Sequence, residues 1–288
     1  MKDIFDFKRF GKYFVSDFKG CVANYGLSLI TISMLLYLIC YVVTVSFGLI
    51  MNQGWEGLGL GTRATLFVIA MITLVITMPV KCYGKITEKQ SGSFFLTLPV
   101  SRLEKFVSML LMTIVVAPVI GTALYLGLDA LVCLFDKTCG NNLVSEMQDL
   151  ATIIMNIPEE AAMEAALGEI PENVAKFIKE ITCPWLYVDD MIGTSLIFLL
   201  GAVFFKKGKT VKTIMACIAL AIAVSITATP IMAPWTNELF DMMDNGNFDE
   251  IFNLGIFRHA ALFDTLNDTL VNIVLLIGIW LRIKTLKH

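Results

Sequence analysis

The sequence predicts an all-α polytopic membrane protein with six transmembrane helices. Hydrophobic residues make up 57% of the 288 residues and charged residues only 16%, which is more apolar surface than one water-soluble core can bury. The apolar residues gather in six stretches, each near the ~20 residues that a helix needs to cross a ~30 Å hydrocarbon layer. Lysine and arginine gather in alternate connections between these stretches. These three observations together predict the fold class.

The predicted spans follow one another along the whole chain. They are Leu27–Ile50, Ala64–Val80, Phe106–Leu128, Leu186–Phe205, Thr213–Ala233 and roughly Leu262–Leu281. All but five of the 22 Lys and Arg residues precede span 1, separate spans 2 and 3 or spans 4 and 5, or follow span 6. By the positive-inside rule both termini are expected in the cytoplasm, and an odd number of spans would break this partition. We therefore expect a multi-pass protein of the cell (inner) membrane.

The sequence divides into four parts, beginning with an amphipathic segment at residues 1–26. Phe7, Phe10, Phe14 and Phe18 recur at helical spacing, with basic residues around the rest of the wheel. This pattern predicts a helix lying on the cytoplasmic leaflet, and a frayed cytosolic tail is the alternative. Spans 1–3 then occupy residues 27–135 and include a polar segment at residues 84–105. A signal peptide is not expected, because charges and aromatic rings interleave near the start.

Residues 136–185 form a long insertion on the predicted outer side, before spans 4–6 and a short cytoplasmic tail in residues 186–288. Two short helices broken at Pro171 are predicted there, and we expect them to form a helical cap over the membrane. The acidity of the insertion indicates a solvated face, with a cation site as the alternative. Cys139 and Cys183 flank the insertion and would form a disulfide if the outer compartment is oxidising; two free thiols are the alternative.

Spans 5 and 6 carry weaker signals. Pro230 and Pro234 are expected to disrupt the end of span 5. Small residues recur every fourth position in that span, which indicates close packing within the chain or, alternatively, a dimer seam or substrate path. In span 6, polar side chains share one face and would lie in the outer headgroup zone or line an outer vestibule. These pathway candidates are Asp264, Asp268 and Asn272.

Motifs for catalysis are missing from the sequence. The chain has two histidines, His259 and His288, and no HExxH or GxSxG pattern, so we expect no enzyme activity, cofactor site or metal site in this chain. The Gly-Lys-Thr run at residues 208–210 lacks the glycine that a phosphate-binding loop needs five residues upstream. We interpret it as a tight basic turn. Nucleic acid is not an expected partner, whereas membrane lipid is.

The segment from Lys85 to Lys105, KITEKQSGSFFLTLPVSRLEK, is too polar to cross a bilayer and is joined at both ends to predicted spans. It must therefore lie at the membrane surface. Pro99 ends its first part, and Ser101 with Glu104 three residues later predicts a capping box at the start of the next helix.

This segment resembles the loop after span 2 in the permease subunits of type-2 ABC exporters. The resemblance rests on Glu88, on Gly92 with Ser93, and on the run Leu96–Arg102, and more weakly on the amphipathic first helix and six spans. It implies a dimer of permease chains, or of this chain with a paralogue, that docks soluble ABC ATP-binding subunits through this loop, so that ATP is used by the partner. The long outer insertion departs from the family layout. The implied ATPase-coupling residues are Lys85, Glu88, Gly92, Ser93, Phe94, Phe95, Leu96, Pro99 and Arg102.

Two other functions stay open at this point. A secondary transporter would need ionisable groups at mid-membrane depth, and Asp129, near an outer end, is the candidate that comes nearest. A scaffold or a self-immunity protein that does not transport is the other alternative. The sequence does not identify a transported substrate.

Overall fold

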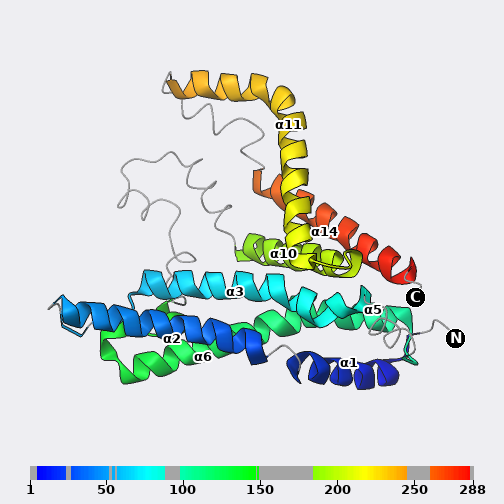
Figure 1. Ribbon diagram of the computed structural model, residues 1–288. Coiled ribbons are helices and arrows are strands. Elements are labelled where there is room, and N and C mark those ends of the chain that lie inside the picture. Colours follow the sequence, from blue (N-terminus) through cyan, green and yellow to red (C-terminus); the bar gives the residue numbers. More distant parts are fainter. Residues whose placement is uncertain are drawn as a thin grey trace.

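The computed structural model describes residues 5–23, 27–51, 54–55, 57–87, 98–146, 148, 184–244 and 260–285. Within these ranges the chain is mostly helical and has no strand, so the predicted all-α class is confirmed (Figure 1). Four helices are long and apolar enough to cross a membrane: Leu60–Thr87, Arg102–Phe135, Lys209–Thr227 and Leu266–Thr285. These helices are compatible with a multi-pass membrane protein. The count of six spans stays a prediction, and the predicted cap lies almost entirely outside the described residues.

The helices coincide with the predicted apolar stretches. In chain order the elements are α1 (Phe7–Cys21), α2 (Leu27–Ile50), α3 (Leu60–Tyr83), the 3-10 turn η2 (Gly84–Thr87), α5 (Arg102–Leu110), the π-helical segment η3 (Leu111–Val116), α6 (Ala117–Phe135), the 3-10 turn η4 (Lys137–Cys139), α10 (Pro184–Phe204), α11 (Lys209–Asp244) and α14 (Ala260–Thr285). Because α5, η3 and α6 follow one another without a break, they form one long rod. In α2 the apolar stretch that the structure describes is shorter than these four and runs over Met34–Ile50.

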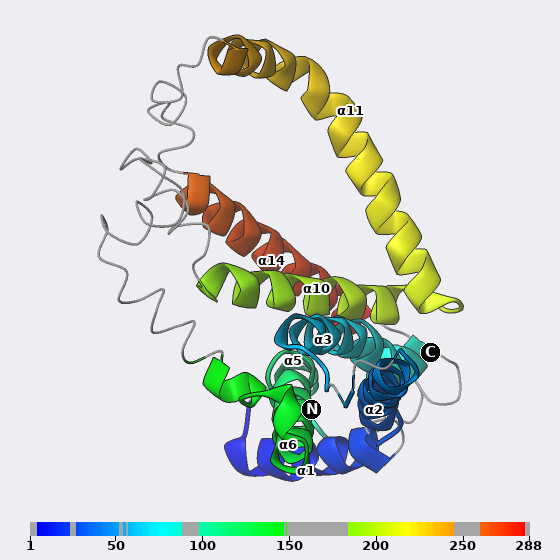
Figure 2. The ribbon, with the colours of Figure 1, turned by 90° about the vertical axis from the view of Figure 1, so that its left-hand side faces the viewer.

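Helices α2, α3 and α5–α6 lie side by side, and α10 packs on α3 and α14. Figure 2 views α2, α3 and α6 nearly end-on and shows α1 lying across them, whereas α10 crosses above α3. Apolar clusters fill the spaces between the helices. One surrounds Met109, Leu199 and Ile279 near the end where α1 begins and α14 ends, and another surrounds Tyr37 and Tyr125 toward the opposite end. A smaller cluster consists of Leu74, Met78 and Ala117.

Helix α11 rises away from the other helices (Figure 1). Pro230 and Pro234, which were predicted to disrupt the end of this span, do not end the helix, because α11 continues to Asp244. A proline removes one backbone hydrogen bond and often kinks a helix without ending it, and Figure 1 shows a marked bend in α11. Ala219 and Ala223 in α11 are exposed, so these small residues do not pack against the described parts of the chain.

The turn between α10 and α11 contains the Gly-Lys-Thr run. Gly208 has a φ of +61°, which is a conformation that favours glycine, and α11 begins at the next residue, Lys209. The run thus forms a tight turn and a helix start, as predicted. Close packing of α10 on α11 continues from this turn, because Gly201 of α10 faces Thr213 of α11.

Replacing Gly201 with alanine is expected to destabilise this contact. The added methyl carbon would lie 2.9 Å from both Cβ and Cγ2 of Thr213, which is closer than packed carbon atoms approach. We expect a lower unfolding temperature in detergent, from a loss of about 1–3 kcal/mol. Gly127→Ala in α6 is the matched control, because a methyl group there meets no atom within 4 Å. Equal unfolding temperatures for the two variants would contradict the packing of Gly201 on Thr213.

Candidate functional site

The candidate site consists of the two described ends of the segment that joins α3 to α5, which are called its roots: η2 and the start of α5. Of the residues predicted to couple to an ATPase, Lys85 lies in η2, Pro99 just before α5, and Arg102 at the first position of α5. The other six lie outside the described residues: Glu88, Gly92, Ser93, Phe94, Phe95 and Leu96. The structure therefore describes both roots of the loop.

The first root, η2, is tied to the α10–α11 turn. The Thr87 hydroxyl donates to the carbonyl oxygens of Gly84, at 3.1 Å, and Phe205, at 3.3 Å. The Lys209 ammonium group donates to the Gly84 carbonyl as well. Thr87 and Ile86 are both buried. The end of α3 and the start of α11 are thus held together at the point where the loop begins.

The second root, at the start of α5, is held by the predicted capping box. The Glu104 amide donates to Ser101 Oγ at 3.2 Å, and the Ser101 amide donates to Glu104 Oε2 at 3.0 Å, so the prediction is confirmed. Arg102 Nη1 donates to the carbonyl oxygen of Lys284, at the end of α14, at 3.1 Å. Lys105 Nζ donates back to the Leu98 carbonyl at 3.3 Å.

Glu104 also binds α1, which the sequence did not predict. Arg9 donates from Nε to Oε2 at 2.9 Å and from Nη2 to Oε1 at 2.6 Å, while the amide of Asp6 donates to Oε1 at 2.9 Å. The Glu104 side chain is fully buried, and its hydrogen bond raises the pKa of Arg9. One carboxylate therefore caps α5 and holds the start of α1.

The other end of α1 is held by Asp17. Its Oδ2 accepts a hydrogen bond from Tyr83 Oη, at 2.9 Å, and another from Ser108 Oγ, at 2.6 Å. Phe14 and Phe18 pack against the buried cluster around Met109. The predicted N-terminal helix is confirmed; its start is anchored on α5, and its end is anchored on α3 and α5. Its placement on a membrane surface stays a prediction.

Substitution of Glu104 should loosen the start of α1. Glu104→Ala removes the acceptor for Arg9, Asp6 and Ser101, so we expect trypsin to cleave within α1 several-fold faster than in the wild-type protein. Val119→Ala, at a side chain that is 62% exposed on α6, should leave the rate unchanged. Unaltered cleavage in the Glu104 variant would show that this carboxylate does not anchor α1.

The role of Asp17 can be tested through the pH dependence of the protein's stability. Burial raises the pKa of Asp17 above its ordinary value of 3.8, and the two hydroxyl donors only partly offset this. Its contribution to stability is therefore complete below that ordinary value and is lost as the pH rises through the raised value. Asp17→Asn keeps an acceptor oxygen without the charge, so its stability should be equal or higher at neutral pH and less dependent on pH.

The control for Asp17→Asn is Asp17→Ala, which leaves both hydroxyl groups without their acceptor. It should be less stable than the wild-type protein by about 1–3 kcal/mol in thermal unfolding. If alanine and asparagine had the same effect, the hydrogen bonds from Tyr83 and Ser108 would not be holding α1.

A second polar cluster lies at the opposite end of the bundle, between α2, α3 and α6. Arg63 Nη1 donates to Asp129 at 3.2 and 3.3 Å, and Tyr37 Oη and the Leu143 amide donate to the same carboxylate at 2.9 and 2.7 Å. Arg63 Nη2 donates to the carbonyl oxygens of Cys139 and Asn141 at 2.8 and 3.0 Å. Both charged side chains are about 1% exposed. This cluster joins three helices and the turn that follows α6.

Asp136, just beyond α6, extends this end of the bundle. Tyr41 and Trp55 donate to its Oδ2 at 2.7 and 2.9 Å. Burial alone would raise the pKa of Asp136, but the hydrogen bonds, together with those from Thr138, outweigh it and lower the pKa below the usual range. The connection after α2 is thereby fastened to the end of α6.

The predicted pathway stripe is described only in part. Asn272 of α14 is buried and donates from Nδ2 to Asp189 Oδ1 of α10 at 2.8 Å, so it joins two helices. Nothing in the sequence pattern pointed to Asp189. Asp268 is half-buried, and Asp264 lies in α14 at a position whose side chain is not described. Cys139 is a buried free thiol, and its predicted partner Cys183 lies outside the described residues, so that disulfide stays a prediction.

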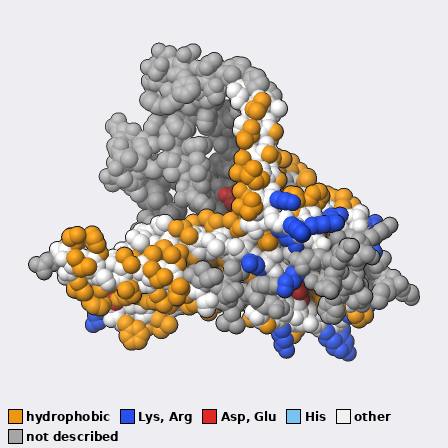
Figure 3. All heavy atoms as spheres, in the orientation of Figure 1, with side chains coloured by type: hydrophobic (Ala, Val, Ile, Leu, Met, Phe, Trp, Pro, Cys, Tyr) orange, Lys and Arg blue, Asp and Glu red, His pale blue; other side chains and the backbone are white. Residues whose placement is uncertain are grey.

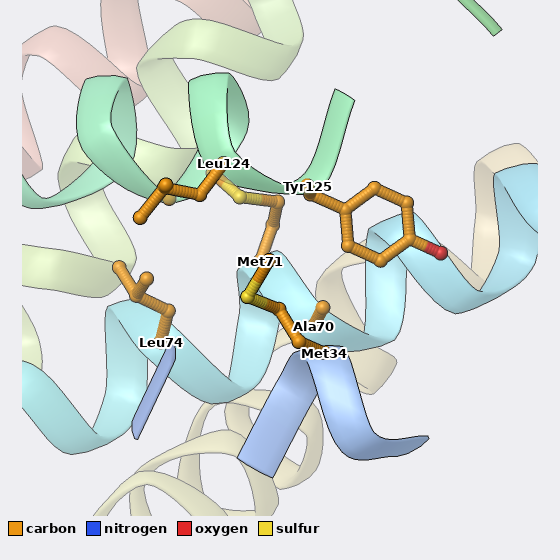
Figure 4. Close-up of a pocket in the computed structure, with 7 residues that line it drawn as sticks. Met34, Ala70, Met71, Leu74, Leu124 and Tyr125 are labelled. Carbon is orange, nitrogen blue, oxygen red and sulfur yellow. The ribbon is translucent and has the colours of Figure 1, made fainter. Parts of the chain in front are cut away.

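A small crevice lies between α2, α3 and α6 (Figure 4). Its lining is apolar apart from the Tyr125 hydroxyl, which donates to the Arg63 carbonyl at 3.2 Å. The crevice therefore offers a substrate little polar recognition. The described residues also hold no group of three or more His, Cys, Asp or Glu that could bind a metal ion. The residues lining the crevice are Met34, Ala70, Met71, Leu74, Gly121, Leu124 and Tyr125.

Comparison of the chain with protein-family models, curated proteins and solved structures gives no match.

Proposed function

We propose that the chain is the transmembrane permease subunit of an ATP-driven ABC exporter, and that it works as a dimer. The loop after span 2 would dock a separate ATP-binding subunit, which hydrolyses the ATP. The observation that carries this proposal is that both roots of the loop are fastened to other helices. Thr87 and Lys209 tie the first root to the α10–α11 turn, while Glu104 and Arg102 tie the second to α1 and α14.

These ties give the loop a mechanical role. ATP binding in a partner moves a permease only through a contact whose free energy differs between the two states. A loop held by both adjoining helices transmits such a contact to α3 and α5, and through their partners to α1, α10 and α14. A loosely tethered surface loop would absorb the displacement instead. The described contacts therefore favour a coupling element over a simple surface connection.

The distribution of basic side chains supports a cytoplasmic loop. In Figure 3, Lys and Arg gather at the end of the bundle that carries α1, the start of α5 and the end of α14. Arg63 and Lys137 belong to the opposite end, and the charge of Arg63 is neutralised by its buried ion pair with Asp129. With six spans and the positive-inside rule, the termini and the loop face the cytoplasm.

The contacts of Asp129 argue against a proton- or ion-driven transporter. A carboxylate that carries a coupling ion must exchange with water from one side and then the other. Asp129 is fully buried and accepts hydrogen bonds from Arg63, Tyr37 and the Leu143 amide. Its surroundings fit a structural ion pair. A scaffold without transport activity has no specific contact in its favour.

Purification of the tagged chain from its native membrane, followed by identification of co-purifying proteins, tests the proposed function. We expect recovery of a soluble ABC ATP-binding subunit. The same purification of Glu88→Arg should lose that subunit while two copies of the permease chain still associate. Repeated absence of an ATP-binding protein from the wild-type sample would contradict the proposal and favour a scaffold.

A further inference from the structure

Basic side chains surround the turn between α10 and α11 and include one from the end of α14. Lys206, Lys207 and Lys212 are exposed and follow one another closely in this turn and the first turn of α11. Arg282 of α14 reaches the same place: its Nε donates to a carbonyl oxygen in the last turn of α10 at 3.4 Å, and its guanidinium carbon lies 5.7 Å from the centre of the Phe204 ring. These four cations form a basic cluster.

No described carboxylate neutralises the basic cluster. The ion pairs found within the described ranges join Arg9 to Glu104 and Arg63 to Asp129. Asp17, another carboxylate at this end of the bundle, accepts hydrogen bonds from side chains of α3 and α5 instead. The basic cluster therefore carries a local excess of positive charge, which an anionic group would match.

An apolar stripe on α11 begins at the basic cluster. Val211, Met215, Ile218 and Ile222 recur at helical spacing, so they share one face of α11, and all four are exposed. Figure 3 shows hydrophobic side chains along α11, with Lys and Arg side chains where this helix meets the bundle. Because Lys209–Thr227 is long and apolar enough to cross a membrane, the stripe would lie beside acyl chains in a bilayer.

We propose that the basic cluster binds the phosphate of an anionic phospholipid whose acyl chains lie along the apolar stripe of α11. The lysines supply positive charge, and the planar guanidinium of Arg282 suits phosphate oxygens. Phe204 is exposed beside it, and aromatic rings gather at the headgroup level of a bilayer. An acidic soluble protein would match the charges but not the apolar stripe that continues from them. This inference needs the membrane spans but not the proposed coupling to an ATP-binding subunit.

Such a lipid would join two helices through its phosphate, because Lys212 belongs to α11 and Arg282 to α14. The same turn already holds the first root of the loop, since the Lys209 ammonium group donates to the Gly84 carbonyl. A ligand that binds only the folded protein stabilises it. We therefore expect the anionic lipid to raise the unfolding temperature of the protein in detergent.

Native mass spectrometry of the purified chain in detergent, titrated with dioleoyl phosphatidylglycerol or with dioleoyl phosphatidylcholine, tests the binding. We expect the anionic lipid to bind at least about tenfold more tightly than the zwitterionic one, because each basic side chain near an anionic headgroup strengthens binding about fivefold. The triple variant Lys206→Gln, Lys207→Gln and Lys212→Gln should lose this preference. Equal affinity for the two lipids in the wild-type protein would leave the cluster to an acidic partner protein and overturn the proposal, as would an unchanged preference in the triple variant.

The matched control removes three other exposed lysines at the same end of the bundle, on α1. The variant Lys8→Gln, Lys12→Gln and Lys19→Gln changes the net charge by the same amount and should keep the preference for the anionic lipid. An equal loss in both triple variants would show general attraction by the basic end and would overturn a site at the turn. Inorganic phosphate should not displace the lipid; displacement would show that phosphate alone is recognised and would contradict the role of the apolar stripe.

Discussion

Asp129→Ala is expected to destabilise the protein by about 3–5 kcal/mol, the largest loss that we expect from a single substitution. The substitution leaves the Arg63 guanidinium buried without its counter-charge, and it removes the acceptor for Tyr37 and for the Leu143 amide. Thermal unfolding in detergent, followed by the reactivity of buried cysteines, measures the loss. Cys139 is 5% exposed and becomes accessible only when this end opens.

Two further variants separate the loss of the buried ion pair from the loss of side-chain packing alone. Leu131→Ala changes a side chain on the same helix that is 54% exposed, and it should alter the unfolding temperature little. The double variant Arg63→Met with Asp129→Leu removes both charges, so its loss should be smaller than the sum of the two single losses. An Asp129→Ala variant as stable as Leu131→Ala would refute a structural ion pair.

Under the proposed function, Glu88→Arg and Gly92→Trp are expected to abolish coupling to an ATP-binding subunit. Reversal of charge at Glu88, or a bulky ring in place of Gly92, would disrupt the surface on which the proposed partner would dock. ATPase activity recovered with the purified complex should fall to the level of the unbound subunit. The variant chains should still be recovered as folded protein, which thermal unfolding in detergent checks.

The matched controls for the loop are Gly92→Ala and Gly127→Trp. The first keeps a small side chain in the loop and should retain most of the recovered activity. The second adds the same bulky ring on α6, where a side chain meets open space, and should leave the partner bound. Full ATPase activity in both Glu88→Arg and Gly92→Trp would show that the loop does not couple the two subunits.

Local patterns in the sequence were sufficient to predict the described long helices and the cap of α5. An apolar stretch in a bilayer has no water to bond its backbone N–H and C=O groups, so these groups bond one another in a helix. Ser101 caps α5 because its partner, Glu104, is only three residues away. Pro230 and Pro234 were expected to disrupt the end of span 5, and α11 continues through them to Asp244, because proline weakens a helix without always stopping it.

The contacts that define the candidate site could not be predicted in this way. Arg9 and Glu104 are 95 residues apart, and Arg63 and Asp129 are 66 residues apart, so nothing local relates either pair. The capping box already accounts for a glutamate at position 104, so there was no reason in the sequence to expect that Glu104 also binds Arg9. A lone arginine near the start of a predicted span suggests a partner in the membrane, but several carboxylates could have supplied it.

Site-specific photocrosslinking from the loop tests the central claim most directly. A benzophenone side chain in place of Phe95, activated in native membranes, should crosslink the chain to a soluble ATP-binding subunit. The same group in place of Phe135, which is 90% exposed at the opposite end of the bundle, should not. If the group at Phe95 captured no ATP-binding protein while the protein remained folded, the loop would not be a coupling element.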